Sequence, residues 1–511
     1  MKNRTKIYFL WVLVIANLIY AETWGLNALI ITLISVPLLA WKDGRLFFDK
    51  KIYHINQPEN TGQWWLVAAT WLTASLAVFF TASFLAVFFY FVTLIYFTAV
   101  QQPSKTSFVL GFGQTVQSFF TGVYRVFHDF GEHFKTGNLG QKKKWLIQTL
   151  MVLVPLLIVI IFFKLYQIAD VNFYELTKFI NLDWISWGFI FVYILLVVFL
   201  YGLYYFKPLN DVVELEKNLK NEINQNYQDK VQNFFGVKQE RKLALVLFIS
   251  LSALLCIYLT LDVHYLFDSF GTVKADSFYS NSIHEGIGAV IFSIVLVIIL
   301  ITYFFRGSLN FEQHRLVKNI SRFWLLLNSL LLITTGAKNF EYVTQLGLTG
   351  KRLGVYLYLI LSLVGLILTI YKITKSLSIW YLIRSSAITF IFVFSLIANI
   401  NWHRFIAEYN LKYVSEQQLD LWYIYELGPD AYPALMDYHI AHNLVQTDLG
   451  IQLANNLIYE RSILANRMNR LTWRSFNYAD YYLAKQLNRF NIIFPNNDEG
   501  QPESNRTAYR D

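Results

Sequence analysis

Polar and ionisable side chains gather where several strongly apolar segments of this sequence end. The stretch SNSIHEGIG carries a His-Glu pair directly before a glycine, and the stretch GAKNFEYVTQLGLTGKRLGVY carries cations among tyrosine, asparagine and threonine. Ionisable groups at the rim of a helix bundle can form a pocket for a polar or anionic ligand, with Lys and Arg as its cationic side. The candidate ligand-binding residues are His284, Glu285, Lys338, Asn339, Tyr342, Thr349, Arg352 and Asn401.

The same residues have a simpler interpretation as interfacial anchors. Trp and Tyr side chains form belts at the depth of lipid headgroups, and Lys or Arg side chains extend to that level without any ligand. This interpretation fits each residue taken singly. The pair His284 and Glu285 fits it least, because it adjoins a glycine-bearing helix start rather than a Lys or Trp anchor. Both interpretations stay open.

Metal or cofactor chemistry has little support in the spacing of these groups. Asp262, His264, His284 and Glu285 could serve as zinc ligands by residue type. However, HEGIG lacks the second histidine, four residues after the first, that metalloprotease helices use. The sequence contains no phosphate-binding loop, dinucleotide fingerprint or nucleophile elbow. We therefore predict neither a metal nor a cofactor, and no catalytic residue can be named.

The composition of this 511-residue chain is typical of a protein embedded in a bilayer. Hydrophobic residues make up 55% and charged residues only 15%, which is too little polar surface for a soluble protein. The net charge of +9 needs no nucleic acid, because membrane proteins concentrate Lys and Arg in their cytoplasmic loops. The single cysteine, Cys256, lies in an apolar run, so no disulfide framework is expected. We predict the lipid bilayer as a partner and no nucleic-acid binding.

Apolar segments long enough to cross a membrane recur along the sequence. A hydrocarbon core about 30 Å thick needs roughly 20 apolar residues per helix. The uncharged run from Trp64 to Val100 is too long for one span, so we predict a hairpin that turns near residues 81–83. The first apolar run follows three cations but lacks a cleavage motif, and it is interpreted as a retained span. The eleven predicted spans are 7–21, 25–41, 64–80, 83–100, 145–163, 184–206, 243–261, 286–305, 323–337, 353–371 and 379–400.

The distribution of Lys and Arg sets the expected orientation. With the N-terminus in the cytoplasm, the predicted cytoplasmic segments hold 26 Lys and Arg residues, whereas the outer loops between spans hold 6. An odd number of spans then places the C-terminal region on the extracytoplasmic side. The charged cytoplasmic stretch 207–242 is expected to form a solvated helix on the membrane surface, with a partner-binding helix as the alternative.

Two similar segments suggest an internal duplication. GLNALIITLISV from Gly25 aligns without gaps with GIGAVIFSIVLV from Gly286, and each leads into a basic, aromatic exit. Spans one to four would then correspond to spans seven to ten, and the copies would share one orientation because the offset is an even number of spans. The predicted fold class is an all-α polytopic membrane helix bundle of about eleven spans, with this parallel repeat as a candidate feature.

Residues 401–494 predict a small α-helical domain on the extracytoplasmic side. Ser415 is a candidate N-cap, and Gly428-Pro429 ends the helix that follows it. The apolar faces of this domain are expected to pack on the bundle near loops 262–285 and 338–352. The expected divisions are 1–100 (first four spans), 101–242 (cytoplasmic loops with spans five and six), 243–400 (spans seven to eleven), 401–494 (outer helical domain) and 495–511 (a tail with the composition of disorder).

Four stretches resemble a family of bacterial membrane proteins. They are SNSIHEGIGAVIFSIVL from 282, EYVTQLGLTGKRLGVYLYL from 341, NWHRFIAEYNL from 401 and WRSFNYADYYLAKQL from 473. The chain resembles the proteins grouped as domain of unknown function 4153/4173, with the Gly-Leu-Thr-x-x-Arg element as the most specific part. That family often has Arg-Asn where this chain has Lys338-Asn339, which keeps the charge but loses the bidentate fork. The resemblance implies a bacterial cytoplasmic (inner) membrane and supplies no reaction.

Three functions are open on the sequence. The favoured one is binding, transport or sensing of an envelope ligand at the extracytoplasmic face, although the spans hold almost no ionisable residues at mid-depth, where transporters couple ions. The second is a membrane-embedded transferase that acts outside on a lipid-linked substrate. Such an enzyme is expected to carry an acidic residue in the first outer loop, where Glu22 is the only one. The third is a scaffold whose partner is another membrane protein.

Overall fold

The structure is a computed structural model of the whole chain, and it describes most but not all of the residues. Of residues 276–287 it describes the helical backbone but not the side chains. The described part is helical or connecting, except for one two-residue antiparallel pair, β1 (Trp41–Lys42) with β2 (Arg45–Leu46). The described residues are 2–42, 45–46, 61–101, 106–135, 170–177, 186–223, 236–269, 276–311 and 314–491, with scattered residues between 151 and 169.

Four apolar helices from the N-terminal part pack around aromatic side chains. Trp64 and Trp71 are buried, and both pack against the ring of Phe97. Ala82, with a φ of 47°, and Ser83 form the tight turn between the third and fourth of these helices. The hairpin predicted from the length of the uncharged run is therefore confirmed. The group comprises α1 (Lys2–Ile19), α2 (Leu26–Ala40), α3 (Thr61–Thr81) and α4 (Phe84–Ala99).

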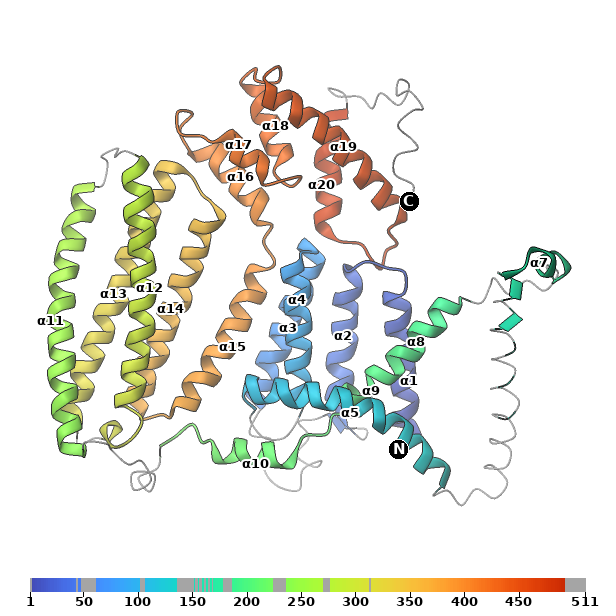
Figure 1. Ribbon diagram of the computed structural model, residues 1–511, viewed down its shortest axis with the longest axis horizontal. Coiled ribbons are helices and arrows are strands. Elements are labelled where there is room, and N and C mark those ends of the chain that lie inside the picture. Colours follow the sequence, from blue (N-terminus) through green and yellow to red (C-terminus); the bar gives the residue numbers. More distant parts are fainter. Residues whose placement is uncertain are drawn as a thin grey trace.

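A long amphipathic helix, α5 (Phe108–Lys135), lies across one end of this first helix group (Figure 1). Its inner face packs closely on the short helix α9 (Tyr201–Tyr204). A Cβ added at Gly202 of α9 would lie 2.1 Å from the carbonyl oxygen of Ser118 on α5. Its outer face exposes aromatic side chains such as Phe120 and Phe127. An apolar outer face of this kind suits a helix at a membrane surface. The helices that follow it are α7 (Val171–Thr177), α8 (Trp187–Phe199), α9 (Tyr201–Tyr204) and α10 (Asn210–Asn218).

A second helix group has an apolar core of its own, in which the rings of Phe248 and Trp324 lie 5.3 Å apart. The helix α15 stands between the two groups, because Ile391 joins the core of the first group while α14 packs on α15 from the other side (Figure 1). The elements are α11 (Val237–Ser269), α12 (Asp276–Phe304), η2 (Ser308–Asn310), α13 (Arg315–Leu346), α14 (Gly350–Lys375) and α15 (Ile379–Ile397).

The predicted duplication stays a prediction. The helices α1–α4 and α11–α14 do form two separate groups, as a duplication would require. Their packing differs, however, since α11 packs mainly on α13, whereas α1 packs mainly on α8.

The last described helices form a group at one end of the bundle (Figure 1). Leu435, Leu453 and Leu457 are fully buried in its apolar core. This end, here called the α19 end, lies opposite the end that carries residue 2, α5 and α10, here called the α5 end. The elements are α16 (Trp402–Tyr413), α17 (Leu421–Glu426), α18 (Tyr432–Ala441), α19 (Asp448–Arg470), α20 (Tyr478–Asn488) and η4 (Arg489–Asn491).

The apolar helices indicate a membrane protein. Each predicted span coincides with a helix, with two exceptions. Segment 184–206 is divided between α8 and α9, and segment 145–163 falls mostly outside the described residues. Eleven as the number of spans stays a prediction. In the described part, five helices are long and apolar enough to cross a bilayer, namely Thr61–Thr81, Val237–Phe267, Arg315–Leu346, Gly350–Lys375 and Ile379–Ile397. Shorter apolar helices are Leu26–Leu39, Phe84–Ala99, Gly188–Tyr204 and Gly288–Phe304.

Candidate functional site

Three of the residues predicted to bind a ligand meet at the connection between α13 and α14. Thr349 caps α14 by accepting a hydrogen bond from the backbone nitrogen of Arg352 at 3.3 Å. The Arg352 guanidinium donates to the carbonyl oxygens of Leu346, at 2.8 Å, and Gly347. It also lies over the ring of Tyr342, 3.9 Å from the centroid. Arg352 therefore closes the C-terminal end of α13, where unpaired carbonyl groups favour a cation.

This connection also receives the C-terminal helices. The Asn410 side chain accepts from the Leu348 nitrogen at 2.6 Å and donates to the Leu348 oxygen at 2.9 Å. The Tyr423 hydroxyl accepts from the Gly350 nitrogen at 3.2 Å, and burial raises the pKa of this phenol. Gly347 has a φ of 80°, a conformation that favours glycine. Part of the expected packing on loop 338–352 is thus present in the structure.

Lys338 and Asn339 are also engaged within the fold. Lys338 forms an ion pair with Asp262 on α11, whose side chain is only 4% exposed. The fully buried Asn339 donates to the backbone oxygen of Arg352 at 3.3 Å. Both cations of the predicted ligand pocket therefore have partners inside the protein.

The remaining predicted residues lie apart from this connection or cannot be placed. Asn401 caps α16 and accepts from the Arg404 nitrogen at 3.2 Å. His284 and Glu285 fall in α12, but their side chains lie outside the described residues. Within the described part of the chain, no group of three or more His, Cys, Asp or Glu side chains could hold a metal. The site prediction as a whole stays a prediction.

A different set of residues surrounds Glu22, in the short loop between α1 and α2. The Glu22 carboxylate accepts from the hydroxyls of Thr472, at 2.9 Å, and Ser475, at 2.6 Å. Arg474 completes the set with a nitrogen 2.6 Å from the same carboxylate. The Glu22 side chain is only 3% exposed, so its charge is neutralised by Arg474 within the protein.

Backbone contacts fix the two loops against each other. The nitrogens of Leu26 and Asn27 donate to the carbonyl oxygens of Phe476, at 2.8 Å, and Arg474, at 2.7 Å. A Cβ at Gly25 would lie 2.5 Å from the Phe476 oxygen, so this close approach requires glycine. The C-terminal helices are therefore held to the first helix group as well as to the α13–α14 connection.

A groove of about 510 Å³ opens beside Glu22, between the α1–α2 loop and the last turns of α19. Arg467 and Arg470 line it together with Asn466 and Ser475. Arg467 pairs with Asp480 at 3.0 Å, whereas among the described residues no ion pair engages Arg470. Part of this positive charge balances the negative end of α19. The rest is available to an anion in the groove.

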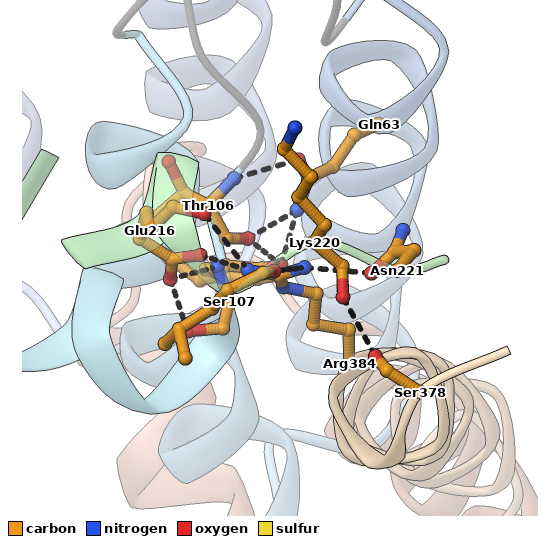
Figure 2. Close-up of polar contacts among 10 residues, drawn as sticks. Gln63, Thr106, Ser107, Glu216, Lys220, Asn221, Ser378 and Arg384 are labelled. Carbon is orange, nitrogen blue, oxygen red and sulfur yellow. Dashed lines mark hydrogen bonds and ion pairs between the residues drawn. The ribbon is translucent and has the colours of Figure 1, made fainter. Parts of the chain in front are cut away.

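A buried ion pair at the α5 end joins three segments (Figure 2). Glu216 of α10 pairs with Arg384 of α15, and the Glu216 side chain is fully buried. The same carboxylate accepts from the Ser107 nitrogen at 2.7 Å, just before α5 begins. Arg384 donates in addition to the Asn221 side chain at 2.6 Å and to the Leu219 oxygen at 2.8 Å. The arrangement is a structural junction, because both charges are paired within the chain and only the Arg384 Nε atom lacks a partner among the described residues of this junction.

The sequence analysis missed the roles of Glu216, Arg467 and Arg474. Glu216 lies in the stretch expected to be a solvated surface helix, and its burial corrects that expectation at this position. Glu22 was distinguished only as the acid of the first outer loop. Arg474 falls in a stretch that carries the family resemblance, which is the one signal that could have pointed to it.

Comparison with known proteins returned one match. A family model described as a domain of unknown function (DUF4153) matches residues 28–438. The matched region contains the Glu216–Arg384 junction and the α13–α14 connection, while Glu22 and the groove residues of α19 lie outside it. No curated protein and no solved structure matches the chain.

Proposed function

Because the chain belongs to the DUF4153 family, whose description assigns no activity, we propose its function from its own geometry. The protein is a multi-pass membrane protein of about eleven spans that binds an anionic envelope ligand at its extracytoplasmic face. The ligand lies in the groove beside Glu22, with Arg467 and Arg470 as its cationic side. The observation that carries the proposal is this groove, which combines two arginines with an already neutralised carboxylate.

The orientation in this proposal follows from charge. The cytoplasmic segments predicted from their Lys and Arg content include those that carry α5 and α10, which lie at one end of the bundle (Figure 1). The α19 end is then extracytoplasmic. An alkaline phosphatase fused after His442 should be active, and a cytoplasmic reporter at the same position should be silent. An inactive phosphatase with an active cytoplasmic reporter would overturn the orientation.

The position of the groove favours an anionic lipid or an anionic lipid-linked molecule as the ligand. The groove lies where α1 ends and α2 begins, which is headgroup depth if both helices span the membrane. Arginine suits phosphate and carboxylate groups because its planar fork donates two parallel hydrogen bonds. Arg470 is exposed and has no ion-pair partner among the described residues, so it can reach a ligand without breaking a contact.

Binding is favoured over the transferase alternative by the state of Glu22. A catalytic acid or base must reach the substrate with a free oxygen and a suitable proton affinity. Both Glu22 oxygens instead accept hydrogen bonds from the 472–475 loop, and Arg474 neutralises the charge. We therefore assign Glu22 to docking of the C-terminal helices. We assign Tyr342, Thr349 and Arg352 likewise to the shape of the α13–α14 connection.

Native mass spectrometry of the purified full chain tests the proposal. We expect co-purifying anionic lipid or lipid-linked species on the wild-type protein and a clear loss of them in Arg470→Gln. The matched control is Arg489→Gln, because Arg489 is also half-exposed but pairs with Asp437, away from the groove. Equal retention in wild type, variant and control would overturn the groove as the site. Co-purification of a membrane protein alone, unaffected by Arg470→Gln, would support the scaffold alternative instead.

A further inference from the structure

A second cavity, at the α5 end, has the chemistry of an anion site. It measures about 230 Å³ and is lined by parts of α1, α2, α5 and α9, and by the segments that follow α4 and α9. Three cations line it, Arg4, Arg125 and Lys207, and Gln101 adds a polar group. The lining contains no carboxylate among the residues that the structure describes. Three positive charges around one small space repel each other unless an anion joins them.

The two arginines are held in place but are incompletely paired. The Arg4 guanidinium lies over the rings of Tyr204, at 5.5 Å, and Tyr205, at 5.0 Å. Arg125 donates to the backbone carbonyl oxygen of Tyr205 and to the Ser118 hydroxyl, each at 3.1 Å. In both arginines the Nε atom is buried and has no hydrogen-bond partner in the described part of the chain. Buried donors of this kind normally find an acceptor.

The acid that could neutralise Arg125 on its own helix is directed elsewhere. Asp129 lies one turn along α5 and accepts from the Tyr201 hydroxyl at 2.7 Å, and it is not part of the cavity lining. Lys207 lines the cavity and is exposed, and no ion pair to it is formed within the described residues. No described residue of the lining therefore balances the positive charge of the cavity.

We propose that this cavity binds the phosphate group of an anionic ligand. Arginine and lysine donors around a small polar space match the several acceptor oxygens of a phosphate. The exposed aromatic face of α5, including Phe120 and Phe127, places the cavity beside the headgroup region of the membrane. The phosphate can come from an anionic phospholipid or from free phosphate, and the experiment distinguishes these sources. The site is separate from the groove at the α19 end and does not depend on it.

The test is a native mass spectrometry titration of the purified full chain in detergent. One series uses phosphatidylglycerol, a second uses zwitterionic phosphatidylcholine, and a third uses inorganic phosphate. The variants are Lys207→Gln and Arg4→Gln, which spare the hydrogen bonds of Arg125 between α5 and the segment after α9. The control is Lys238→Gln, an exposed cation at the start of α11.

We expect saturable binding of phosphatidylglycerol or of inorganic phosphate, weakened about ten-fold by each of the two variants and unchanged in the control. Preference for phosphatidylglycerol over both other probes assigns the site to a lipid headgroup, and binding of inorganic phosphate assigns it to the free anion. Equal affinity in wild type, Lys207→Gln and Arg4→Gln would overturn the proposal. Equal binding of the anionic and zwitterionic lipids, with no binding of phosphate, would also overturn it.

Discussion

Replacement of Glu216 by Gln removes the charge from the buried pair that joins α10 to α15. The Glu216 side chain is 0% exposed and that of Arg384 is 10% exposed, so water cannot replace the lost partner. Glutamine has nearly the same shape, which leaves packing intact and isolates the effect of charge. The Arg384 guanidinium would keep neutral acceptors: the Leu219 oxygen at 2.8 Å, the Asn221 side chain at 2.6 Å, the backbone oxygen of residue 216 at 3.5 Å and the new glutamine amide.

The expected magnitude follows from the cost of an unpaired buried charge. Removal of one partner from a buried ion pair destabilises a protein by about 3–5 kcal/mol. We expect Glu216→Gln near the lower bound, about 3 kcal/mol, because Arg384 retains hydrogen bonds to neutral groups. Arg384→Gln should cost at least as much, since a fully buried carboxylate would keep Ser107 as its main donor. The double variant should be less destabilised than the sum of the singles by about 2 kcal/mol.

The free energy of unfolding can be measured by titration of the purified protein in mixed micelles with a denaturing detergent. The matched control is Glu214→Gln, which removes the same charge two residues earlier on α10, where the side chain is exposed. That control should change the unfolding free energy by no more than about 0.5 kcal/mol. If Glu216→Gln proved no more destabilising than Glu214→Gln, the structural role of the ion pair would be refuted.

Three further changes test close contacts of the fold. Gly25→Ala places a methyl group against the Phe476 oxygen and should lower the free energy of unfolding by about 1–3 kcal/mol. It should also increase protease cleavage in the 471–477 loop, and unchanged cleavage would contradict the docking of this loop. Gly202→Ala should disrupt the packing of α9 on α5 and lower the thermal midpoint, whereas Gly354→Ala, with no atom near its added Cβ, should leave that midpoint in place. Asn410→Ala removes both hydrogen bonds to the Leu348 backbone and should lower the free energy of unfolding, measured by denaturant titration, by about 1–3 kcal/mol. An unchanged free energy of unfolding would show that this contact is dispensable.

The helices could be predicted from the sequence because their signal is local. An apolar run of membrane length specifies a helix whatever it packs against, since the backbone must satisfy its own hydrogen bonds in lipid. The hairpin turn was located in the same way, from a run too long for one span. The break at Leu200 between α8 and α9 was not predicted, because the apolar run continues through it. Hydropathy records the composition of a segment and not a change in its direction.

The sites could not be predicted in the same way because they depend on distant pairs. Glu216 and Arg384 are 168 residues apart, and Glu22 and Thr472 are 450 residues apart. An acid in a polar stretch looks the same in sequence whether it faces water or an arginine from another helix. For the candidate residues at the outer rim, the sequence identified the residues but not their structural role. The sequence identified Arg352 as a candidate ligand-binding residue, but only the structure shows that it closes the end of α13.

Each of the buried ion pairs lies within one of two bodies. The first body contains the first helix group, α10, α15 and the C-terminal helices, and the second body consists of α11–α14. Glu216–Arg384 ties α10 to α15 at the α5 end, and Glu22–Arg474 ties the first helix group to the 471–477 loop at the opposite end. The pairs Lys338–Asp262 and Arg306–Glu240 lie inside the second helix group.

Between the two bodies, the hydrogen bonds of the described residues are neutral. Asn410 binds Leu348 at the α19 end, and at the α5 end the Ile223 nitrogen, in the segment after α10, donates to the oxygen of Ser376 at the end of α14, at 3.4 Å. Neutral hydrogen bonds are weaker than charge-assisted ones, so a movement of α11–α14 against the rest would break these contacts before any ion pair. The groove beside Glu22 and the cation cavity both lie on the first body. Within the described part of the chain, a ligand in either place would therefore act on the second body through α15 and these neutral contacts.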